Sequence, residues 1–313
     1  MKNKHRWPLL YGLALTAFSA YVLLDAFVIP RSYSTVTEGA SSSAITASSE
    51  GGGGTIGGGG TAENGGAAES AVITDSSYND GSCAIQITQY RAYDTDLYVA
   101  DITLTGAETL KTALANNTYG KNVTAATSEI AADNGAILAI NGDYYGARSG
   151  YVIRNGVLYR SASAGSEQQD LVIGADGSFS IVREGDVTAE ELLNAGAQQV
   201  LSFGPGLLED GKITVEQNTE VDKAKTSNPR TAAGILGPLH YVFVVADGRT
   251  EESSGVSLYE LAEFMQKLGV QAAYNLDGGG SSTMVFNGAV VNCPTSDGRR
   301  IQERRVSDIV FIG

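Results

Sequence analysis

The sequence predicts an α+β fold with a mixed, largely antiparallel β-sheet core and packed helices, preceded by a single N-terminal transmembrane helix. Three observations support this fold class. Short strand-like apolar runs recur beyond residue 75, and pairs of Asn or Asp with Gly separate many of them. Helical patterns are fewer and do not alternate strictly with the strand-like runs, which argues against a regular α/β architecture.

The N-terminal segment reads as a membrane anchor. Basic residues within the first six positions precede an apolar stretch over 7–29, which at helical rise spans about 34 Å. A cleaved signal peptide has the same basic start, but cleavage near Ala17 and Ser19 would leave an apolar stub. We expect residues 1–31 to be a cytoplasmic tail and an uncleaved signal-anchor in the cell membrane. The C-terminal domain is then extracytoplasmic, or secreted if the segment is cleaved.

Residues 32–74 have the composition of a linker. Ser, Thr, Ala and Gly dominate, with glycine runs at 51–54 and 57–60, so the segment cannot build a core. A flexible coil of this length reaches roughly 35 Å, which would hold the following domain, residues 75–313, at a variable distance from the membrane.

Local patterns predict the elements of that domain. We expect strands at 98–104, 136–140, 151–153, 171–173, 179–182, 241–246, 270–276 and 309–312. Hairpin turns are expected at Asn155-Gly156, Asp176-Gly177, Asp210-Gly211 and Asn287-Gly288. Helices are expected at 108–115, at 123–132, and after the capping boxes Thr188 with Glu191 and Ser257 with Glu260.

Composition narrows the chemistry. A net charge of −14, from 35 acidic and 21 basic residues without a basic run, argues against a nucleic-acid partner. Only two histidines occur, which excludes His-rich metal sites and most His-based catalysis. Carboxylates, hydroxyls, arginines and the backbone must therefore act without a required cofactor. Aspartates could still hold a divalent cation, although no EF-hand loop is present.

Cys83 and Cys293 are the only cysteines. Outside the cytoplasm they could form a disulfide, and the alternative is two free thiols. Both alternatives stay open at this stage, because the sequence does not show whether the two Cα atoms come within reach.

The segment from Asn275 to Ser282 has the strongest functional pattern. A predicted strand delivers Asp277 at its carboxyl end, and Gly278, Gly279 and Gly280 would let backbone N–H groups approach an anion. Ser281 and Ser282 add hydroxyls. The segment has neither the lysine of a P-loop nor a nucleophile elbow. It is typical of a phosphate or sugar cradle beside a carboxylate, and the alternative is a glycine turn capped by Asp277.

Other polar residues also follow predicted strands. Asp247, in Asp247-Gly248-Arg249, would emerge at the same sheet edge as Asp277 if both strands run the same way, so the two carboxylates could divide acid and base roles. The alternative is a simple Asp-Gly turn.

Asn141 and Asp143, with the tyrosines at 144 and 145, offer the amide, carboxylate and aromatic faces that bind sugars, unless the tyrosines are core residues. Arg230 and Arg305 suit phosphate, although each alone also reads as a surface charge.

Together these motifs resemble the phosphodiester glycosidase family, which includes bacterial proteins labelled exopolysaccharide-related. The resemblance runs from about 97 to 313 and rests on the following motifs: Asn-Gly-Asp-Tyr-Tyr at 141–145, Arg154-Asn155-Gly156, Phe203-Gly204-Pro205-Gly206, Pro229-Arg230-Thr231-Ala232, Asp247-Gly248-Arg249, the 275–284 segment, and Arg305.

The resemblance implies hydrolysis of a sugar-1-phosphodiester, with N-acetylglucosamine α-linked to phosphate as the type substrate. By position, Asp277, Asp247, Arg230, Arg249 and the turn 278–282 correspond to the family's cleft residues. Many relatives resemble Asn-Gly-Gly-Phe-Phe at 141–145, so Asp143 departs from the pattern and could signal a different substrate.

A phosphate leaving group is a weak base, so the implied cleavage needs little acid assistance. We expect Asp277 to activate water or to steady positive charge on the sugar, with Asp247 or Asp143 as the second carboxylate. Two alternatives remain open. One is a non-catalytic module that binds phosphorylated glycan during exopolysaccharide or cell-wall assembly. The other is transfer of the sugar to an acceptor hydroxyl.

Overall fold

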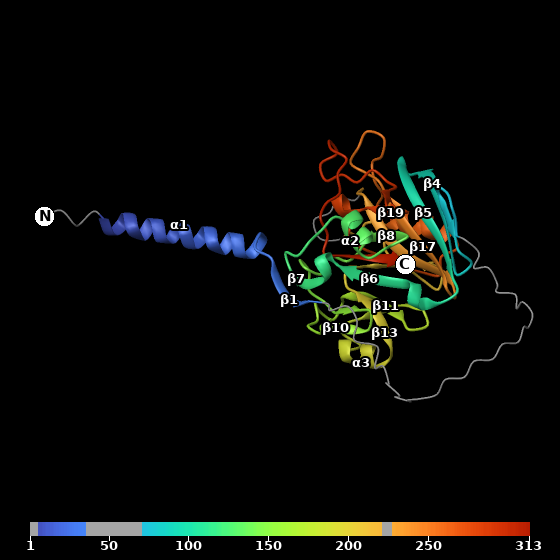
Figure 1. Cartoon of the computed structure of the whole chain (residues 1–313), viewed down its shortest axis with the longest axis horizontal. Helices are drawn as coiled ribbons and strands as arrows, with labels where there is room; N and C mark the ends of the chain where they lie inside the picture. Colours follow the sequence, from blue (N-terminus) through green and yellow to red (C-terminus); the bar gives the residue numbers. More distant parts are fainter. Residues whose placement is uncertain (1–5, 36–70, 221–226) are drawn as a thin grey trace, which may run out of the picture.

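A computed structural model describes residues 6–35, 71–220 and 227–313. Its largest element is a nine-stranded sheet in which every pairing is antiparallel, with the order β15-β14-β18-β16-β17-β5-β4-β3-β2 (Figure 1). The strands of this sheet are β2 (Val72–Ile73), β3 (Ser77–Asn79), β4 (Cys83–Ala92), β5 (Thr95–Leu104), β14 (Gly206–Glu209), β15 (Lys212–Ile213), β16 (Arg230–Gly237), β17 (His240–Ala246) and β18 (Ala272–Asn275).

Two five-stranded antiparallel sheets and a two-stranded sheet complete the β-structure. The order β20-β19-β8-β21-β6 comprises β6 (Leu110–Leu114), β8 (Leu138–Asn141), β19 (Met284–Phe286), β20 (Ala289–Val290) and β21 (Asp308–Ile312). The order β10-β9-β13-β11-β12 comprises β9 (Val152–Arg154), β10 (Val157–Arg160), β11 (Gln169–Gly174), β12 (Phe179–Arg183) and β13 (Ala197–Leu201). The small sheet pairs β1 (Arg31–Thr35) with β7 (Thr118–Lys121).

The main hydrophobic core lies between these sheets. One face of the nine-stranded sheet contributes Ile102 and Phe243, the second sheet Ile140, and the third Leu171 and Leu201. The short helices cover the outer faces: α4 (Leu258–Lys267) packs on the nine-stranded sheet, α2 (Thr127–Asp133) on the second sheet and α3 (Ala189–Asn194) on the third. Three 3₁₀ turns, η1 (Ala107–Thr109), η2 (Ala115–Asn117) and η3 (Gly279–Ser281), link strands. The predicted α+β class is therefore confirmed.

Most local predictions agree with the structure. All eight expected strands form, and each expected Asx-Gly turn joins two antiparallel strands of a hairpin. Both capping boxes start helices, with Thr188 accepting from the Glu191 amide and Ser257 from the Glu260 amide. The helix expected at 123–132 begins only at Thr127.

The helix expected at 108–115 is wrong. Leu110–Leu114 instead forms β6, which pairs along its whole length with the C-terminal strand β21. Hydrogen bonding and packing against a distant strand override the weak local helix preference.

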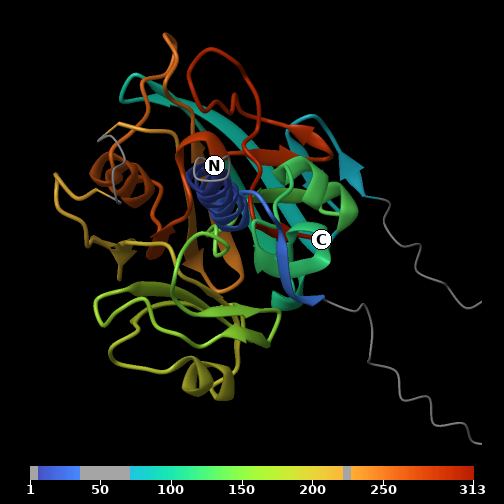
Figure 2. The same ribbon diagram turned by 90° about the vertical axis from the view of Figure 1, so that its left-hand side faces the viewer.

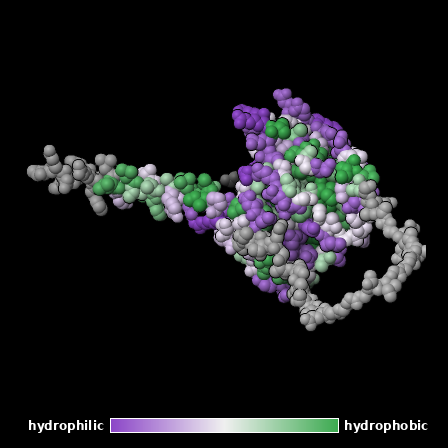
Figure 3. All heavy atoms as spheres, in the orientation of Figure 1, coloured by the Kyte–Doolittle hydropathy of each residue, from purple (hydrophilic) through white to green (hydrophobic). Residues whose placement is uncertain are grey.

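The N-terminal helix α1 (Arg6–Phe27) projects from the domain (Figure 1). Its window Leu10–Phe27 has a mean hydropathy of 1.6 and is 0% buried, so within the described residues it is long and apolar enough to cross a membrane; a signal sequence would have the same character. Figure 3 shows its apolar colouring along much of the helix. Asp25 and Arg31 form an ion pair at its outer end.

The structure differs from the expected linker at both ends. Residues 32–35 belong to β1, and residues 72–73 form β2. Between them, 36–70 lie outside the described residues.

Candidate active site

Three chain segments meet at one edge of the nine-stranded sheet. Strand β16 is antiparallel to both β17 and β18, so these two run in the same direction and their carboxyl ends lie together. Arg230 opens β16 opposite Ala246, which precedes Asp247. Asn275, two residues before Asp277, pairs with Ala232 on the same strand. The structure therefore brings Asp247 and Asp277 to one edge, as the sequence pattern suggested.

The glycine-rich turn is shaped by close approaches. A Cβ on Gly278 would lie 2.9 Å from the Pro229 carbonyl oxygen. Gly279 has a φ of +63°, and a Cβ there would lie 2.8 Å from Nη2 of Arg249. Only glycine combines this backbone conformation with such a near guanidinium group. The turn thus holds Arg249 against the segment that follows Asp277.

The backbone amides of this turn are mostly occupied. The Asp277 amide donates to the Gly142 carbonyl at 3.2 Å, the Gly279 amide to Pro229 at 2.8 Å and the Ser282 amide to Gly279 at 3.1 Å. Most of the backbone amides that were expected to bind an anion therefore donate to carbonyls within the protein. The other donors close to the turn are arginine side chains.

Arg304, which sequence reasoning missed, is central to the site. Its Nη2 donates to Asp277 Oδ2 at 2.7 Å and to the Gly278 carbonyl at 3.1 Å, and its Nε donates to Ser281 Oγ at 2.8 Å. The predicted Arg305 points elsewhere: it donates to the Thr124 carbonyl and pairs with Glu129 at 3.1 Å. The sequence signal was the arginine pair before the last strand: the prediction named Arg305, whereas Arg304 is the member that contacts Asp277.

Arg230 and Arg249 complete what we call the arginine cluster: Arg230, Arg249 and Arg304. Arg230 is buried and donates to the Val256 carbonyl at 3.2 Å. Burial lowers the pKa of Arg230 to about 10, with Glu220 opposing and Arg249 adding to the change. Burial and the nearby Arg304 likewise lower the pKa of Arg249. The three guanidinium groups therefore act on one another electrostatically.

Asp277 provides the carboxylate beside this cluster. Its side chain is 9% exposed and forms an ion pair with Arg304. Glu220 also acts on Arg230, so two carboxylates face three guanidinium groups here, in a chain whose net charge is −14. A surplus of partly buried positive charge is suited to an anionic ligand.

Asp247 has a different setting. Its Oδ1 accepts from Asn292 Nδ2 at 2.9 Å and from the Cys293 amide at 3.0 Å, and burial raises its pKa. Asn292 also donates to the Ser282 carbonyl at 3.0 Å. Asp247 therefore positions Asn292, which contacts the end of the glycine-rich turn.

Two asparagines connect the turn to neighbouring strands. Asn141 donates to the Asp277 carbonyl at 2.6 Å and accepts from Thr231 Oγ1 at 2.8 Å. Asn275 donates to the Gly204 carbonyl at 2.7 Å. Among the described residues, Oδ1 of Asn275 and Oγ of Ser282 are buried without a hydrogen-bond partner, which is uncommon outside functional sites.

Asp143 lies in a buried ion-pair network rather than in the cluster. Its carboxylate accepts from Arg154 at 2.8 Å, from the Ser202 amide at 2.7 Å and from the Tyr145 amide at 3.1 Å. Arg154 also binds Asp308 at 2.8 Å. Asp143 is 0% exposed, so its contacts favour a structural role over the reacting role expected from the sequence.

The tyrosines after Asp143 divide between core and surface. Tyr145 is 1% exposed and packs in the core. Tyr144 is half-buried, and its ring centre lies 5.8 Å from the guanidinium carbon of Arg304. Only Tyr144 therefore remains available to a ligand.

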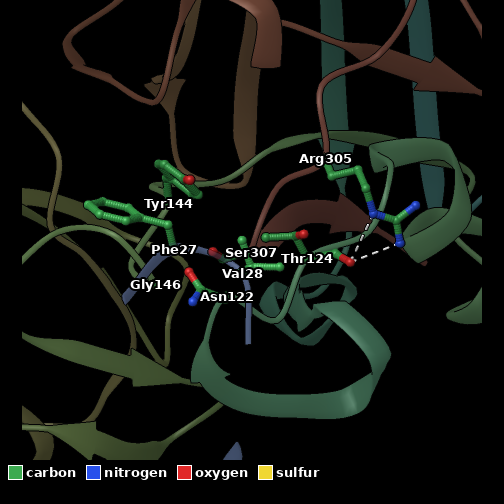
Figure 4. A pocket seen from close by; sticks show the side chains of 8 residues that line it. All are labelled: Phe27, Val28, Asn122, Thr124, Tyr144, Gly146, Arg305 and Ser307. Carbon is green, nitrogen blue, oxygen red and sulfur yellow. Dashed lines mark hydrogen bonds between the residues drawn. The ribbon is translucent and has the colours of Figure 1, made fainter. Parts of the chain in front are cut away.

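Two cavities are lined by residues that lie near the cluster or act on it. One, of about 290 Å³, includes Tyr144 and Arg305 (Figure 4). The other, of about 240 Å³, includes Phe203, Gly204 and Glu220, whose charge acts on Arg230. The cluster thus has one cavity on the Tyr144 side and another on the Phe203 side.

Cys83 and Cys293 are both free thiols, so the structure contains no disulfide between them. Cys83 pairs with Leu104 at one end of β5, whereas Cys293 binds Asp247 beyond the other end, next to Leu97. Seven residues of extended strand span about 23 Å, far beyond the Cα separation that a disulfide permits.

In the described parts of the chain, no group of three or more His, Cys, Asp or Glu residues is placed to hold a metal ion.

A family model described as phosphodiester glycosidase matches residues 134–313, more than half of the chain. The matched region contains Asn141, Asp277 and the whole arginine cluster. Among solved structures, the catalytic domain of zebrafish N-acetylglucosamine-1-phosphodiester alpha-N-acetylglucosaminidase, auto-inhibited by its pro-peptide, has a TM-score of 0.59 at 21% identity, covering 74% of this chain and 82% of that one. An exported protein from Burkholderia pseudomallei shares the fold at a TM-score of 0.50 and 16% identity, covering 70% and 74% of the two chains.

Curated relatives show the same relationship in sequence. The prophage-derived protein YomE of Bacillus subtilis is 31% identical over 56% of this chain and 28% of its own length. N-acetylglucosamine-1-phosphodiester alpha-N-acetylglucosaminidase from cattle is 31% identical over 60% of this chain and 39% of its own length, and the human enzyme 32% identical over 56% and 37%. The chain therefore spans less than half the length of these relatives. It belongs to the phosphodiester glycosidase family.

Proposed function

We propose that this chain hydrolyses a sugar-1-phosphodiester with an N-acetylglucosamine-like sugar. The observation that carries the proposal is the arginine cluster beside Asp277, because three guanidinium groups that outnumber the nearby carboxylates suit a phosphate ester next to a reacting sugar carbon. The names of the cattle and human relatives support the choice of substrate.

The arginine cluster would bind the phosphate. Arg304 and Arg249 are held by contacts with Ser281, Ser296 and Asn228, so their donors are oriented before substrate arrives. When the bond between the sugar carbon and the phosphate oxygen breaks, the oxygen leaves with the phosphate, and nearby guanidinium groups stabilise the charge that develops.

The sugar would occupy the cavity of about 240 Å³ on the Phe203 side. Phe203 lines this cavity with the guanidinium carbon of Arg148 4.2 Å from its ring centre, and Gln168 and Gln169 supply amides, which together suit a ring with several hydroxyls. Gly204 in the same cavity accepts from Asn275, which connects the sugar side to the glycine-rich turn.

Asp277 is the carboxylate that we assign to the chemistry. It would accept a proton from the attacking water or steady positive charge on the sugar carbon. Asp247 and Asp143 are engaged by Asn292 and Arg154 respectively. We therefore assign both of them positioning roles.

We also propose where the protein acts in the cell. Residues 1–31 would anchor the protein in the cell membrane, and 75–313 would act outside the cytoplasm on cell-envelope or exopolysaccharide material. The mature N-terminus in membrane fractions tests this, because a start near Ala20 would show cleavage and secretion.

The activity is tested with the full chain in detergent, using an α-N-acetylglucosamine-1-phosphodiester and measuring released sugar. Asp277→Asn is expected to lower turnover by at least about a thousandfold while the diester still binds. The matched control, Asp133→Asn, changes an exposed carboxylate on α2 and is expected to be neutral.

Parallel assays with a chelator test whether a divalent cation takes part. Binding of the diester without release by the unaltered chain would contradict the hydrolase and support the glycan-binding module.

A further inference from the structure

The end of α1 is fastened directly to the domain. Only three residues, 28–30, separate Phe27 from β1, and they span at most about 11 Å. Strand β1 pairs antiparallel with β7, with Arg31 opposite Lys121. Asn122 then donates to the carbonyls of Ala26 at 3.4 Å and Ile29 at 3.2 Å. The membrane end of the helix and the edge of the domain are therefore one connected surface.

This attachment fixes which face of the domain lies toward the membrane. Figure 2 looks along α1 toward the domain, so the face seen there would lie next to a bilayer crossed by the helix. The headgroup layer on each side of a bilayer is about 5–8 Å thick, comparable with the short connection after Phe27. In a membrane crossed by α1, this face would therefore lie at the depth of lipid phosphates.

The cavity of about 290 Å³ joins this attachment to the candidate active site. Phe27 and Val28 line it from the end of α1, and Tyr144 lines it from the domain (Figure 4). The Tyr144 ring is 5.8 Å from the guanidinium carbon of Arg304, which pairs with Asp277. One aromatic ring thus separates the apolar residues at the end of α1 from Arg304.

The charge around the helix end is basic although the chain as a whole is acidic. Arg31, Lys121 and Arg305 lie near the attachment or line the cavity, against two carboxylates: Asp25 pairs with Arg31, and Glu129 pairs with Arg305. The surplus is therefore one basic group, and a basic group next to a membrane attracts anionic headgroups by about 1 kcal/mol. Apolar residues and basic charge at this depth suit a ligand that has both a lipid part and a phosphate.

We propose that the substrate is held in the membrane: a sugar-1-phosphodiester whose second ester group is a lipid. The lipid-side ester would pass along Phe27 and Tyr144, the phosphate would bind the arginine cluster, and the sugar would lie in the cavity on the Phe203 side. This rests on the proposed function and on α1 spanning the membrane. Water attacks the sugar carbon, the bond from that carbon to the phosphate oxygen breaks, and a lipid phosphate is released.

The test uses the full chain in phospholipid vesicles. Two substrates carry the same sugar and phosphate: one ends in a long-chain lipid alcohol within the same vesicle, and the other is a water-soluble methyl ester. A fifteen-residue Gly-Ser insertion between Pro30 and Arg31 separates the helix from β1. The matched control places the same insertion after Gly54, outside the described residues.

The insertion after Pro30 is expected to lower turnover of the vesicle-borne substrate about tenfold while turnover of the soluble ester is unchanged, which also reports correct folding. The control is expected to change neither rate. Equal turnover of the vesicle-borne substrate by both insertions would overturn the proposal. So would faster turnover of the soluble ester after the Pro30 insertion, because residues 27–35 would then be a cover over the site. Turnover of neither substrate by the unaltered chain would contradict the proposed function itself.

Discussion

Two regions of the molecule place arginine beside aspartate, yet they differ in balance and in exposure. In the buried network, Arg154 lies between Asp143 and Asp308, and all three are at most 2% exposed. In the arginine cluster, Arg304 pairs with Asp277, Glu220 acts on Arg230, and the Arg304 side chain is 41% exposed. The first region has more carboxylates than cations, and the second has the reverse.

This difference separates a structural ion pair from a ligand site. Burial raises the pKa of Asp308 to about 7, with Asp143 adding and Arg154 opposing, so the network reduces its excess negative charge by keeping a proton. Arginines cannot lose their charge so readily. The cluster therefore keeps a surplus positive charge that a phosphate can neutralise.

The largest expected effect is on stability, at the buried network. Arg154→Met would leave Asp143 and Asp308 buried without their cation, and we expect it to lower the free energy of unfolding by about 3–5 kcal/mol. Urea unfolding measures this. The control is Arg183→Met, at an exposed position at the end of β12. If Arg154→Met changes the free energy of unfolding by less than about 1 kcal/mol, the buried network is not the structural ion pair that we distinguish from the ligand site.

The next effect is on activity, at the cluster. Arg304→Met is expected to lower kcat/KM on a soluble diester about a hundredfold, with little loss of stability, because a half-exposed donor to phosphate is removed. Its neighbour provides the matched control, since Arg305→Met should change kcat/KM less than threefold. Steady-state kinetics measures both variants. Equal losses of kcat/KM would contradict the assignment of the phosphate site to Arg304.

A smaller effect is expected at the turn. Gly279→Ala adds a Cβ beside Nη2 of Arg249, where φ is +63°. We expect a loss of about tenfold in kcat/KM, because Arg249 must shift. Gly288→Ala is the control: it also has positive φ, but nothing lies within 4 Å of its Cβ. Similar kinetics for the two variants would argue against a role for Arg249.

The smallest effect is a pH dependence of stability. The native state keeps a proton on Asp308 that the unfolded chain releases between about pH 4 and 7, so this contribution to stability falls as pH rises through that window. Asp308→Asn should make the fall of the unfolding free energy with pH shallower by at most about 1 kcal/mol per pH unit. Urea midpoints at pH 5 and 7 measure it, and unchanged slopes would show that Asp308 is ionised throughout.

The fold was predictable where the signals are local. Asx-Gly pairs and capping boxes act over a few residues, so the hairpins and the helices α3 and α4 follow from short patterns. Strand β6 was missed because its partner β21 lies about 200 residues later in the sequence. No pattern within residues 108–115 reports that pairing.

The candidate site likewise has residues that local patterns predicted and residues that depend on distant contacts. Asp277, its glycines and their place beside Asp247 follow from polar residues at the ends of apolar strands. The choice between Arg304 and Arg305 depends on which side of one loop meets Asp277, and neighbouring residues of an extended chain face opposite ways. The ion pair of Asp143 did not follow from the sequence, because its partner Arg154 comes from another sheet.

The most direct measurement is the affinity of the Asp277→Asn chain for the intact sugar-1-phosphodiester, by calorimetry, with and without Arg304→Met. The single variant should bind the diester without cleaving it, and the double variant should bind at least about tenfold more weakly, since a charged hydrogen bond to phosphate is lost. Equal affinities for the two variants would contradict the claim that the arginine cluster holds the phosphate.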